Sequence, residues 1–294
     1  MASVWDSVVG QGRAVEQLQH AAISPVHAYL LVGTEGCGKD EASRAFAAML
    51  LSGSDDPNER INEMAMRGAH PDIHEVRRDG ASILKDQADD IIKIASITPS
   101  ESSRKVIIVH EVHLMAPATA AMLLKTVEEP PSGVFFIMLA DQVDDSLATI
   151  ASRCLTVHFG LLENADIEQA LINSGVAPTL AHAAAQSSAG SMSRAKLLAS
   201  DPQLAQRREF FANIPRRIDG TGATVAAIVE QILELIDDAV EPLSNQHAQE
   251  VVDTEKTLAL MGVKRGGKKM LEDRHKRENR RYRTDELRSG LTAI

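Results

Sequence analysis

Residues 33–40 read GTEGCGKD, which differs from a complete phosphate-binding loop at a single position. A nucleotide-hydrolysing P-loop has the pattern G-x-x-x-x-G-K-[ST], in which the final Ser or Thr places its hydroxyl on Mg²⁺. Gly33, Gly38 and Lys39 match this pattern, but Asp40 stands where the hydroxyl is required. The stretch therefore indicates an ATPase-type fold whose own metal site is altered.

The sequence around this loop is typical of a parallel α/β sheet. Apolar runs with the length of buried strands alternate with helical patterns up to residue 160. Strand, glycine loop and helix follow one another over 27–51, which is the context that a P-loop requires. We expect four strands, within 27–33, 104–115, 133–141 and 146–159, and helices at 40–51 and 116–129. The predicted fold class is α/β, with a P-loop and a parallel sheet.

The rest of the chain is predicted to be helical. No strand pattern recurs after residue 160, and helical segments follow with Asn, Asp, Ser and Gly between them. The sequence stops at Ile294, directly after an apolar-periodic segment and without a capping signal, so we expect the last domain to be incomplete. We expect an α/β domain at 1–160, a helical lid at 161–203 and a further helical domain at 204–294, with a linker at 264–269.

Composition and charge narrow the class of protein. The 294 residues contain two Cys, which excludes a disulfide framework and favours a reducing, cytoplasmic location. No stretch is long and apolar enough to span a membrane, and the N-terminus lacks the order of a signal peptide. A net charge of −10 repels a nucleic-acid backbone, and 3% aromatic residues do not favour base stacking. Any work on nucleic acid is therefore expected to go through partners.

One segment is basic against this acidic background. Residues 264–288 contain 11 Lys and Arg against five Asp and Glu. Glu272 precedes Lys276 by four residues, as Asp273 precedes Arg277, and this spacing supports an exposed helix. The segment is either a nucleic-acid-binding arm or a solvated helix face. Its interspersed acids favour the solvated face.

The phosphate cradle itself is preserved, by Gly33, Gly36, Gly38 and Lys39. Asp40 adds a carboxylate at a helix N-terminus, where the helix dipole favours an anion. Asp40 either stands in for the charge of a phosphate or is an ordinary acid of the first helical turn. Weak binding of ATP or ADP stays open, because the cradle allows it and Asp40 opposes it.

A second position that would contact the metal is also altered. Walker-B strands end in Asp-Glu, whereas the strand within 104–115 leads into His110-Glu111. A neutral imidazole is a poor ligand for Mg²⁺, which prefers oxygen, although Glu111 retains the chemistry to orient a water molecule. A metal role for His110 and His113 is disfavoured, because no Cys cluster accompanies them. We expect no intrinsic ATPase activity, no metal site and no cofactor.

One arginine is a candidate for a role at the nucleotide site of a neighbouring subunit. Arg153, in IASRC (150–154), follows the predicted α/β core. An Arg donated across a subunit boundary stabilises the transition-state charge on a neighbour's γ-phosphate, an effect of roughly 10³–10⁵ in rate. Taken alone, the tripeptide is more often a surface Arg with a solvated partner.

Several motifs together resemble the clamp-loader branch of the AAA+ ATPases. HAYLLVGTEGCGK (27–39), VHEVHLM (109–115), LLKTVEEPP (123–131) and TIASRC (149–154) have this branch's order and spacing. The segment 8–18 resembles the box beside the adenine pocket, and 189–198 resembles the lid segment that carries the sensor-2 arginine, here Arg194. Within the branch the sequence is most similar to bacterial DNA polymerase III delta-prime subunits, closely over 1–200 and more weakly beyond.

The resemblance implies an AAA+ subunit with a degenerate nucleotide site that keeps the arginine of the SRC motif. Such subunits are accessory components of a DNA polymerase holoenzyme. They join clamp-loader ATPase subunits and a delta subunit in a hetero-pentameric ring, which loads the sliding clamp on primed DNA. Arg153 would then be an arginine finger acting in trans, the helical domain at 204–294 would be the ring's collar, and no membrane partner is implied.

The sequence departs from the family pattern at two places. Residues 55–72 carry no Cys where family members commonly have a four-Cys zinc module, so we expect no zinc. The sensor-1 position falls near Ala140 and Asp141, neither of which fits it. The rival hypothesis is an active, atypical motor subunit in which Asp40 binds Mg²⁺ directly. Asp40 and His110 together argue against it.

Overall fold

The computed structural model describes residues 2–78, 82–145, 147–201, 203–260 and 268–291. Its internal contacts divide the chain into two compact units. The first unit is Met1–Ile167 with Gly190–Met192, and the second is Glu168–Ala189 with Ser193–Ile294. Each unit is described separately below, and the three-domain division stays a prediction.

The first unit is built on a five-stranded parallel sheet with the order β2-β3-β4-β1-β5. Tyr29 of β1, which lies between β4 and the edge strand β5, pairs with Ile137 of β4 on one side and with Leu155 of β5 on the other. The strands are β1 (Ala28–Val32), β2 (Ile73–Val76), β3 (Lys105–Val109), β4 (Val134–Ala140) and β5 (Leu155–His158).

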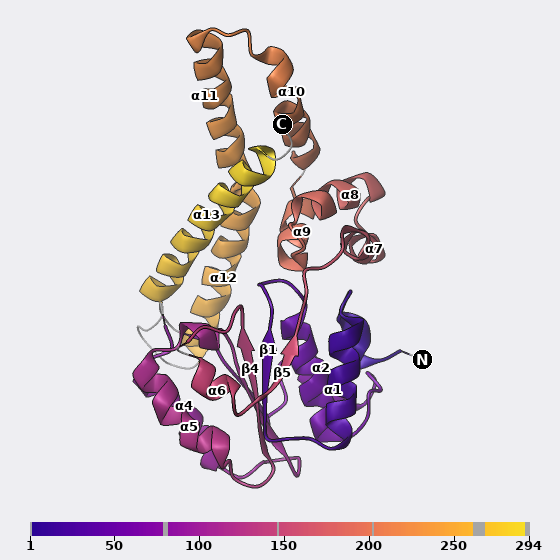
Figure 1. Cartoon of the computed structure of the whole chain (residues 1–294), viewed down its shortest axis with the longest axis vertical. Coiled ribbons are helices and arrows are strands. Elements are labelled where there is room, and N and C mark those ends of the chain that lie inside the picture. The colour runs from indigo at the N-terminus through magenta and orange to yellow at the C-terminus, as the bar shows by residue number, and fades with distance from the viewer. Residues whose placement is uncertain (1, 79–81, 146, 202, 261–267, 292–294) are drawn as a thin grey trace. The chain divides into compact units, whose positions relative to one another are not determined.

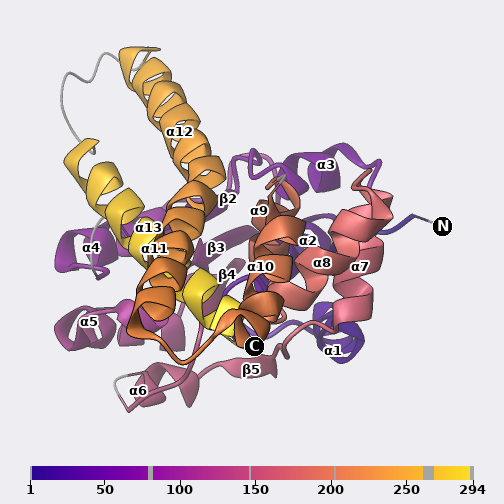
Figure 2. The ribbon, with the colours of Figure 1, turned by 90° about the horizontal axis from the view of Figure 1, so that it is seen from above.

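Helices cover both faces of this sheet, as Figures 1 and 2 show. Along β1, Tyr29 and Leu31 point into one core, and Leu30 and Val32 point into the other, because side chains alternate along a strand. The first core is covered by α1 (Gly12–Ile23), α2 (Lys39–Ser52) and α3 (Arg60–Met66), and the second by α4 (Lys85–Ser96), α5 (Pro117–Glu128) and α6 (Ala148–Ala151). Burial on both faces explains the continuous apolar runs of β1 and β3.

The predicted strands are confirmed, but the sequence analysis missed β2. This edge strand reads IHEV, and only Ile73 in it is buried. An edge strand with polar side chains lacks the apolar run by which the other strands were recognised. The strand predicted within 104–115 is also shorter than the expected range, because it ends at Val109 and a 3₁₀ turn, η2 (Val112–Leu114), follows.

The second unit is helical, as expected. It contains α8 (Pro178–Ser187), α10 (Leu204–Arg217), α11 (Gly222–Ala239), α12 (Glu241–Leu260) and α13 (Lys268–Leu291), together with most of α7 (Asn164–Asn173) and α9 (Met192–Ala199). Phe211, Ile214 and Ile228 form a core between α10 and α11. Helices α12 and α13 are joined by a stacked pair of imidazoles, His247 and His275, whose ring centroids lie 3.9 Å apart.

The basic segment 264–288 forms most of α13, apart from 264–267, which lie outside the described residues. The helix is not a wholly solvated face, because His275, Tyr282 and Glu286 are buried. Gly290 also packs directly on the ring of Phe211 in α10. The expected linker at 264–269 lies partly outside the described residues. The end of the last domain at Ile294, which we expected to be incomplete, also lies outside them.

Candidate functional site

The P-loop has the expected local structure, because β1 leads into the glycines and α2 begins at Lys39. Gly36 and Gly38 have φ angles of 78° and 94°, a region that favours glycine. A Cβ atom on Gly33 would lie 2.7 Å from Cβ of Phe159 and 2.8 Å from Sγ of Cys37. The first and last glycines of the motif are therefore required by the backbone, whether or not a phosphate binds.

The loop lysine is engaged within the protein. Lys39 is buried, and its Nζ donates hydrogen bonds to the carbonyl of Gly33 (2.8 Å) and to Oδ1 of Asp141 (2.8 Å). Asp141 directly follows β4, at the carboxyl end of the sheet where the P-loop also lies. In a nucleotide-bound P-loop this lysine reaches the β- and γ-phosphates. Here a carboxylate already neutralises it.

The two altered metal positions contact each other. Nδ1 of His110 lies 3.1 Å from Oδ1 of Asp40, and Nε2 of the same ring lies 3.2 Å from Oε2 of Glu75. His110 is only 3% exposed. The three side chains come from three elements: Asp40 from the first turn of α2, Glu75 from β2, and His110 from the residue after β3. One imidazole therefore links two carboxylates across the end of the sheet.

Two arginines complete this network. Arg44 of α2 donates to both oxygens of Glu75, from Nε (2.6 Å) and from Nη2 (3.0 Å). Nη2 of Arg77 lies 3.3 Å from Asp40 and 3.6 Å from Glu75. We call Arg44, Glu75, His110, Asp40 and Arg77 the ion-pair ladder. Each carboxylate of the ladder contacts at least two nitrogen-bearing side chains.

The ladder shifts the pKa values of its members. Burial lowers the pKa of His110, but its bonds to Asp40 and Glu75 outweigh burial and leave that pKa raised. Burial raises the pKa of Asp40, but His110, Arg77 and Lys39 outweigh it and leave the pKa lowered. Burial likewise raises the pKa of Glu75, but bonds from His110 and Arg44 hold it far below its ordinary value. The site therefore favours two carboxylates with a protonated imidazole between them.

The residue expected to orient a water molecule is also engaged. Glu111 accepts a hydrogen bond from Nε of Arg78 at 2.8 Å, and its backbone has a φ angle of 52°. His113, two residues on, accepts a hydrogen bond at Nδ1 from the backbone amide of Asp141 (3.1 Å). His113 therefore helps to hold Asp141, which is the ion-pair partner of Lys39.

Sequence reasoning missed the role of Gln11, in the segment 8–18. Its Nε2 donates to the carbonyl of Cys37 in the P-loop (3.0 Å) and to the carbonyl of Gly160 (2.7 Å). Its Oε1 accepts a hydrogen bond from the amide of Gly160 (3.3 Å). Gln11 thus ties the N-terminal segment to the loop and to the end of β5. A buried Gln between two glycines gives no periodic signal, so the pattern did not reveal it.

The proposed finger, Arg153, lies on the surface of the first unit, just before β5. Its Nη1 donates to the carbonyl of Thr149 (2.7 Å) and to Oγ of Ser152 (3.1 Å), and its Nε pairs with Glu128 at the end of α5. The side chain is 38% exposed. The LLKTVEEPP and SRC motifs are thus in direct contact through Glu128 and Arg153, which their sequence separation of 25 residues did not reveal.

The proposed sensor-2 residue, Arg194, belongs to the second unit. Its Nε donates to the carbonyl of Ser187 (3.0 Å), and its Nη2 donates to Oε1 of Glu286 in α13 (2.9 Å). Glu286 also contacts Arg207, which in turn pairs with Asp201. Arg194 therefore takes part in a buried charge cluster inside its own unit.

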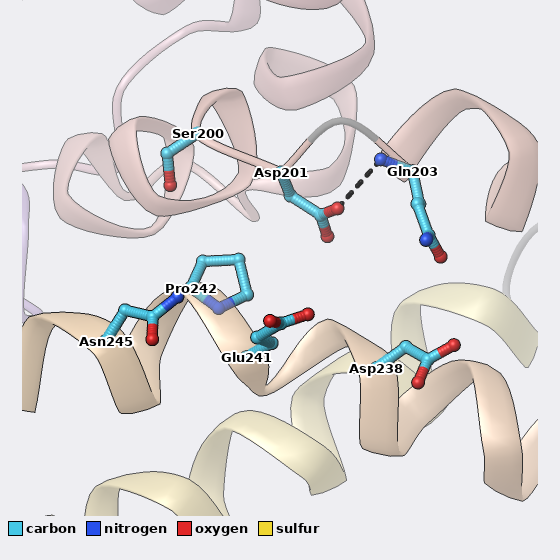
Figure 3. A pocket seen from close by; sticks show the side chains of 7 residues that line it. All are labelled: Ser200, Asp201, Gln203, Asp238, Glu241, Pro242 and Asn245. Carbon is cyan, nitrogen blue, oxygen red and sulfur yellow. Dashed lines mark hydrogen bonds between the residues drawn. The ribbon is translucent and has the colours of Figure 1, made fainter.

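The second unit also contains an open pocket of about 420 Å³ between Ser200–Gln203 and the junction of α11 and α12 (Figure 3). Its acids are Asp201, Asp238 and Glu241, and Ser200, Gln203, Pro242 and Asn245 complete the lining. Asp201 accepts a hydrogen bond from the amide of Gln203, the residue before α10 (2.9 Å). An acidic lining opposes phosphate binding, so this pocket is not a second nucleotide site.

Two kinds of feature are absent from the described part of the chain. Nowhere in it do three His, Cys, Asp or Glu side chains gather in a geometry that could hold a metal ion. No helix formed by the described residues has both the length and the apolar character of a membrane span.

Comparison with known proteins identifies the family. The sequence model of the family described as "DNA polymerase III, delta subunit" matches residues 10–163, which is more than half of the chain. The chain belongs to this family. The match covers the whole P-loop sheet and the segments LLKTVEEPP and TIASRC.

Curated relatives agree with the family assignment. The delta-prime subunit of DNA polymerase III from Bacillus subtilis is 36% identical over 159 residues, which are 53% of this chain and 48% of that protein. The tau subunit from the same organism is 34% identical over 163 residues, which are 53% of this chain and 29% of that protein. This family member thus matches half or less of the length of these relatives.

A solved structure resembles a larger part of this family member. It is a DNA polymerase III gamma-subunit-related protein from Thermotoga maritima, with a TM-score of 0.48, 15% identity and coverage of 93% of this chain and 99% of that one. The expected membership of the DNA polymerase III clamp-loader family and the expected α/β class with a parallel sheet are confirmed. The roles of the individual site residues stay predictions.

Proposed function

We propose that this protein is a clamp-loader subunit that does not hydrolyse ATP and that donates Arg153 to a neighbouring ATPase subunit. It would act in a hetero-pentameric ring with clamp-loader ATPase subunits and a delta subunit, in the cytoplasm. Sliding clamp and primed DNA would be reached through the assembled ring. An acidic chain with a net charge of −10 suits contact with DNA through partners.

The contact between Asp40 and His110 is the observation that supports this proposal most directly. A hydrolysing P-loop needs a hydroxyl and a Walker-B carboxylate free to hold Mg²⁺. In this protein the residues at both positions are bound to each other, at 3.1 Å, and to Glu75 and Arg77. The metal-holding half of the catalytic apparatus is therefore replaced by a structural network.

Two further contacts point the same way. Lys39 is neutralised by Asp141, so its charge is only partly available to a γ-phosphate. Glu111 is paired with Arg78, so it would have to break that pair to orient an attacking water. The two groups for turnover that the sequence keeps, Lys39 and Glu111, are thus each bound to another side chain.

The surroundings of Arg153 fit action in trans. Its guanidinium is partly exposed and is held at the junction of α6 and β5 by hydrogen bonds from Nη1 to Thr149 and Ser152. A fixed, partly exposed guanidinium beside an exposed carboxylate exchanges partners at low cost, because surface ion pairs contribute only about 0–1 kcal/mol. A neighbour's γ-phosphate, with more negative charge, would compete well with Glu128.

The first test is steady-state ATP turnover by the purified chain with Mg²⁺, with Lys39→Ala as the control for contaminating ATPase. We expect no turnover above that of the Lys39→Ala protein. Turnover that the substitution abolishes would instead establish the rival hypothesis, an active motor-type subunit.

The second test places Arg153→Ala in a ring reconstituted with the ATPase and delta subunits. We expect the ring to assemble and its ATPase rate to fall by roughly 10³ if Arg153 serves the rate-limiting site. Arg67→Ala is a matched control, since Arg67 is an exposed arginine of the same unit that pairs with Glu63 four residues before it. A rate equal to that of the control ring would exclude the finger role.

A further inference from the structure

The P-loop of the AAA+ fold implies a divalent cation, so we tested whether the residues of this chain fit one. Mg²⁺ requires near-octahedral oxygen ligands at about 2.1 Å and is usually held by one or two carboxylates plus phosphates. The two residues at its expected contact positions are Asp40 and His110. Only one of them offers oxygen, and the other is a nearly buried imidazole.

The imidazole fills the space that a cation would need. His110 lies between Asp40 and Glu75, with one ring nitrogen on each carboxylate, at 3.1 Å and 3.2 Å. A cation that reached Asp40 would have to displace the ring from both carboxylates, while the main chain that carries the ring is held by the bond from the His110 amide to the carbonyl of Val76 (2.9 Å). Displacing the ring would also leave Glu75 without one of its partners.

The local charge also opposes a cation. The ladder contains two carboxylates, Asp40 and Glu75, against two guanidinium groups, Arg44 and Arg77, before His110 is counted. Lys39 and Asp141 beside the ladder cancel each other. A divalent cation would therefore enter a region with no net negative charge to attract it, where like charges repel it at short range. The residues do not fit Mg²⁺.

The geometry points to a specific replacement: the side chain of His110 occupies the place of the divalent cation and excludes it. The ring links the first turn of α2 to the ends of β2 and β3. The P-loop of this protein therefore takes no Mg²⁺, with or without a nucleotide, and Asp40 and His110 are the residues that determine this. This goes beyond absence of turnover, because a P-loop that binds Mg²⁺ and nucleotide without hydrolysis would satisfy the proposed function equally well.

The test uses Mn²⁺, which shares the oxygen preference of Mg²⁺ and broadens nearby NMR signals. The full chain is labelled at its histidine rings, and a His110→Gln protein identifies the signals of His110. Mn²⁺ is then added with and without ADP. We expect the His110 signals to keep their intensity while those of exposed His20 serve as the measure of non-specific broadening. Selective loss of the His110 signals would overturn the inference and leave the proposed function intact.

A double variant, Asp40→Thr with His110→Asp, tests the same assignment in the opposite direction. It restores a hydroxyl and a carboxylate at the two contact positions, while His113 remains beside Asp141 as the reporter. With ADP present, we expect Mn²⁺ to remove the His113 signals of the double variant but not those of the unsubstituted protein. A folded double variant whose His113 signals resist Mn²⁺ would show that these two residues are not what excludes the cation.

Discussion

Lys39 and Asp141 form an ion pair at 2.8 Å, between the first residue of α2 and the residue after β4. The pair joins the P-loop to the position where the family pattern places its sensor-1 residue. A carboxylate at that position lies where a bound phosphate would otherwise meet the lysine. The charge of Lys39 is therefore neutralised without a bound phosphate.

Replacing Asp141 with Asn should strengthen nucleotide binding. The change removes a negative charge from the phosphate site and frees Lys39, and we expect about a tenfold gain in ADP affinity, equivalent to about 1.4 kcal/mol. Titration with a fluorescent ADP analogue measures it. Asp145→Asn, an exposed acid after the same strand, is the control for a general charge effect. Equal affinities for the two variants would contradict the role given to Asp141.

Removing the imidazole of His110 should destabilise the first unit. His110→Gln leaves two carboxylates facing each other with fewer partners. We expect a loss of about 2–3 kcal/mol, less than for a fully buried pair because Asp40 is partly exposed. The single tryptophan, Trp5, is buried in this unit, so its fluorescence in urea reports the unfolding of this unit. His20→Gln, on the exposed side of α1, should change the midpoint little, and a His110→Gln midpoint equal to it would refute the prediction.

The stability that the ladder contributes should decrease both at acidic pH and at alkaline pH. The pKa of His110 is raised on folding, so its contribution is complete below about pH 6.5 and is lost as the pH rises through the folded value. The pKa values of Asp40 and Glu75 are lowered, so their contribution is complete above about pH 4.5 and is lost as the pH falls. We therefore expect the stability difference between the unsubstituted protein and His110→Gln to be largest between about pH 5 and 6.5.

Urea midpoints of both proteins, followed by Trp5 fluorescence from acid to alkaline pH, measure this difference. The difference should shrink on the alkaline side as the imidazole loses its proton. A difference that keeps growing as the pH rises above about 6.5 would show that the ring acts as a neutral group.

Glu128 should position Arg153 for its neighbour. Glu128→Gln removes the charge that holds the guanidinium, and Glu129→Gln is a matched control on the adjacent exposed acid. In the reconstituted ring, we expect Glu128→Gln to lower kcat about two- to tenfold, less than Arg153→Ala, because loss of orientation costs less than loss of the group. The KM for ATP should change less than kcat, since Arg153 acts mainly on the charge that develops in the transition state. A changed KM with constant kcat would contradict positioning.

The basic face of α13 should not contribute to DNA binding. Arg280 and Arg288 are exposed, whereas Tyr282 and Glu286 on the same helix are buried. We expect Arg280→Ala with Arg288→Ala to leave both the DNA affinity of the ring and its dependence on salt unchanged. A nucleic-acid arm would instead lose about one unit of salt slope for each phosphate contact removed.

The sequence alone determined the features that depend on neighbouring residues in the chain. Gly36, Gly38 and Lys39 predicted the loop, since glycine backbone freedom and the following helix are local properties. The apolar runs of β1, β3 and β4 predicted a sheet covered on both faces. The edge strand β2 was missed, because its polar residues hide a strand that only pairing with β3 makes visible.

Only the tertiary structure decided what the altered positions do. The sequence showed Asp40 and His110 as two separate losses, 70 residues apart, and left Asp40 between two interpretations. Parallel strands bring their carboxyl ends to one edge of the sheet, and there the two residues meet each other, Glu75 and Arg77. The pairings of Lys39 with Asp141 and of Arg153 with Glu128 arise in the same way, because side-chain contacts between distant segments depend on the register of the sheet rather than on local pattern.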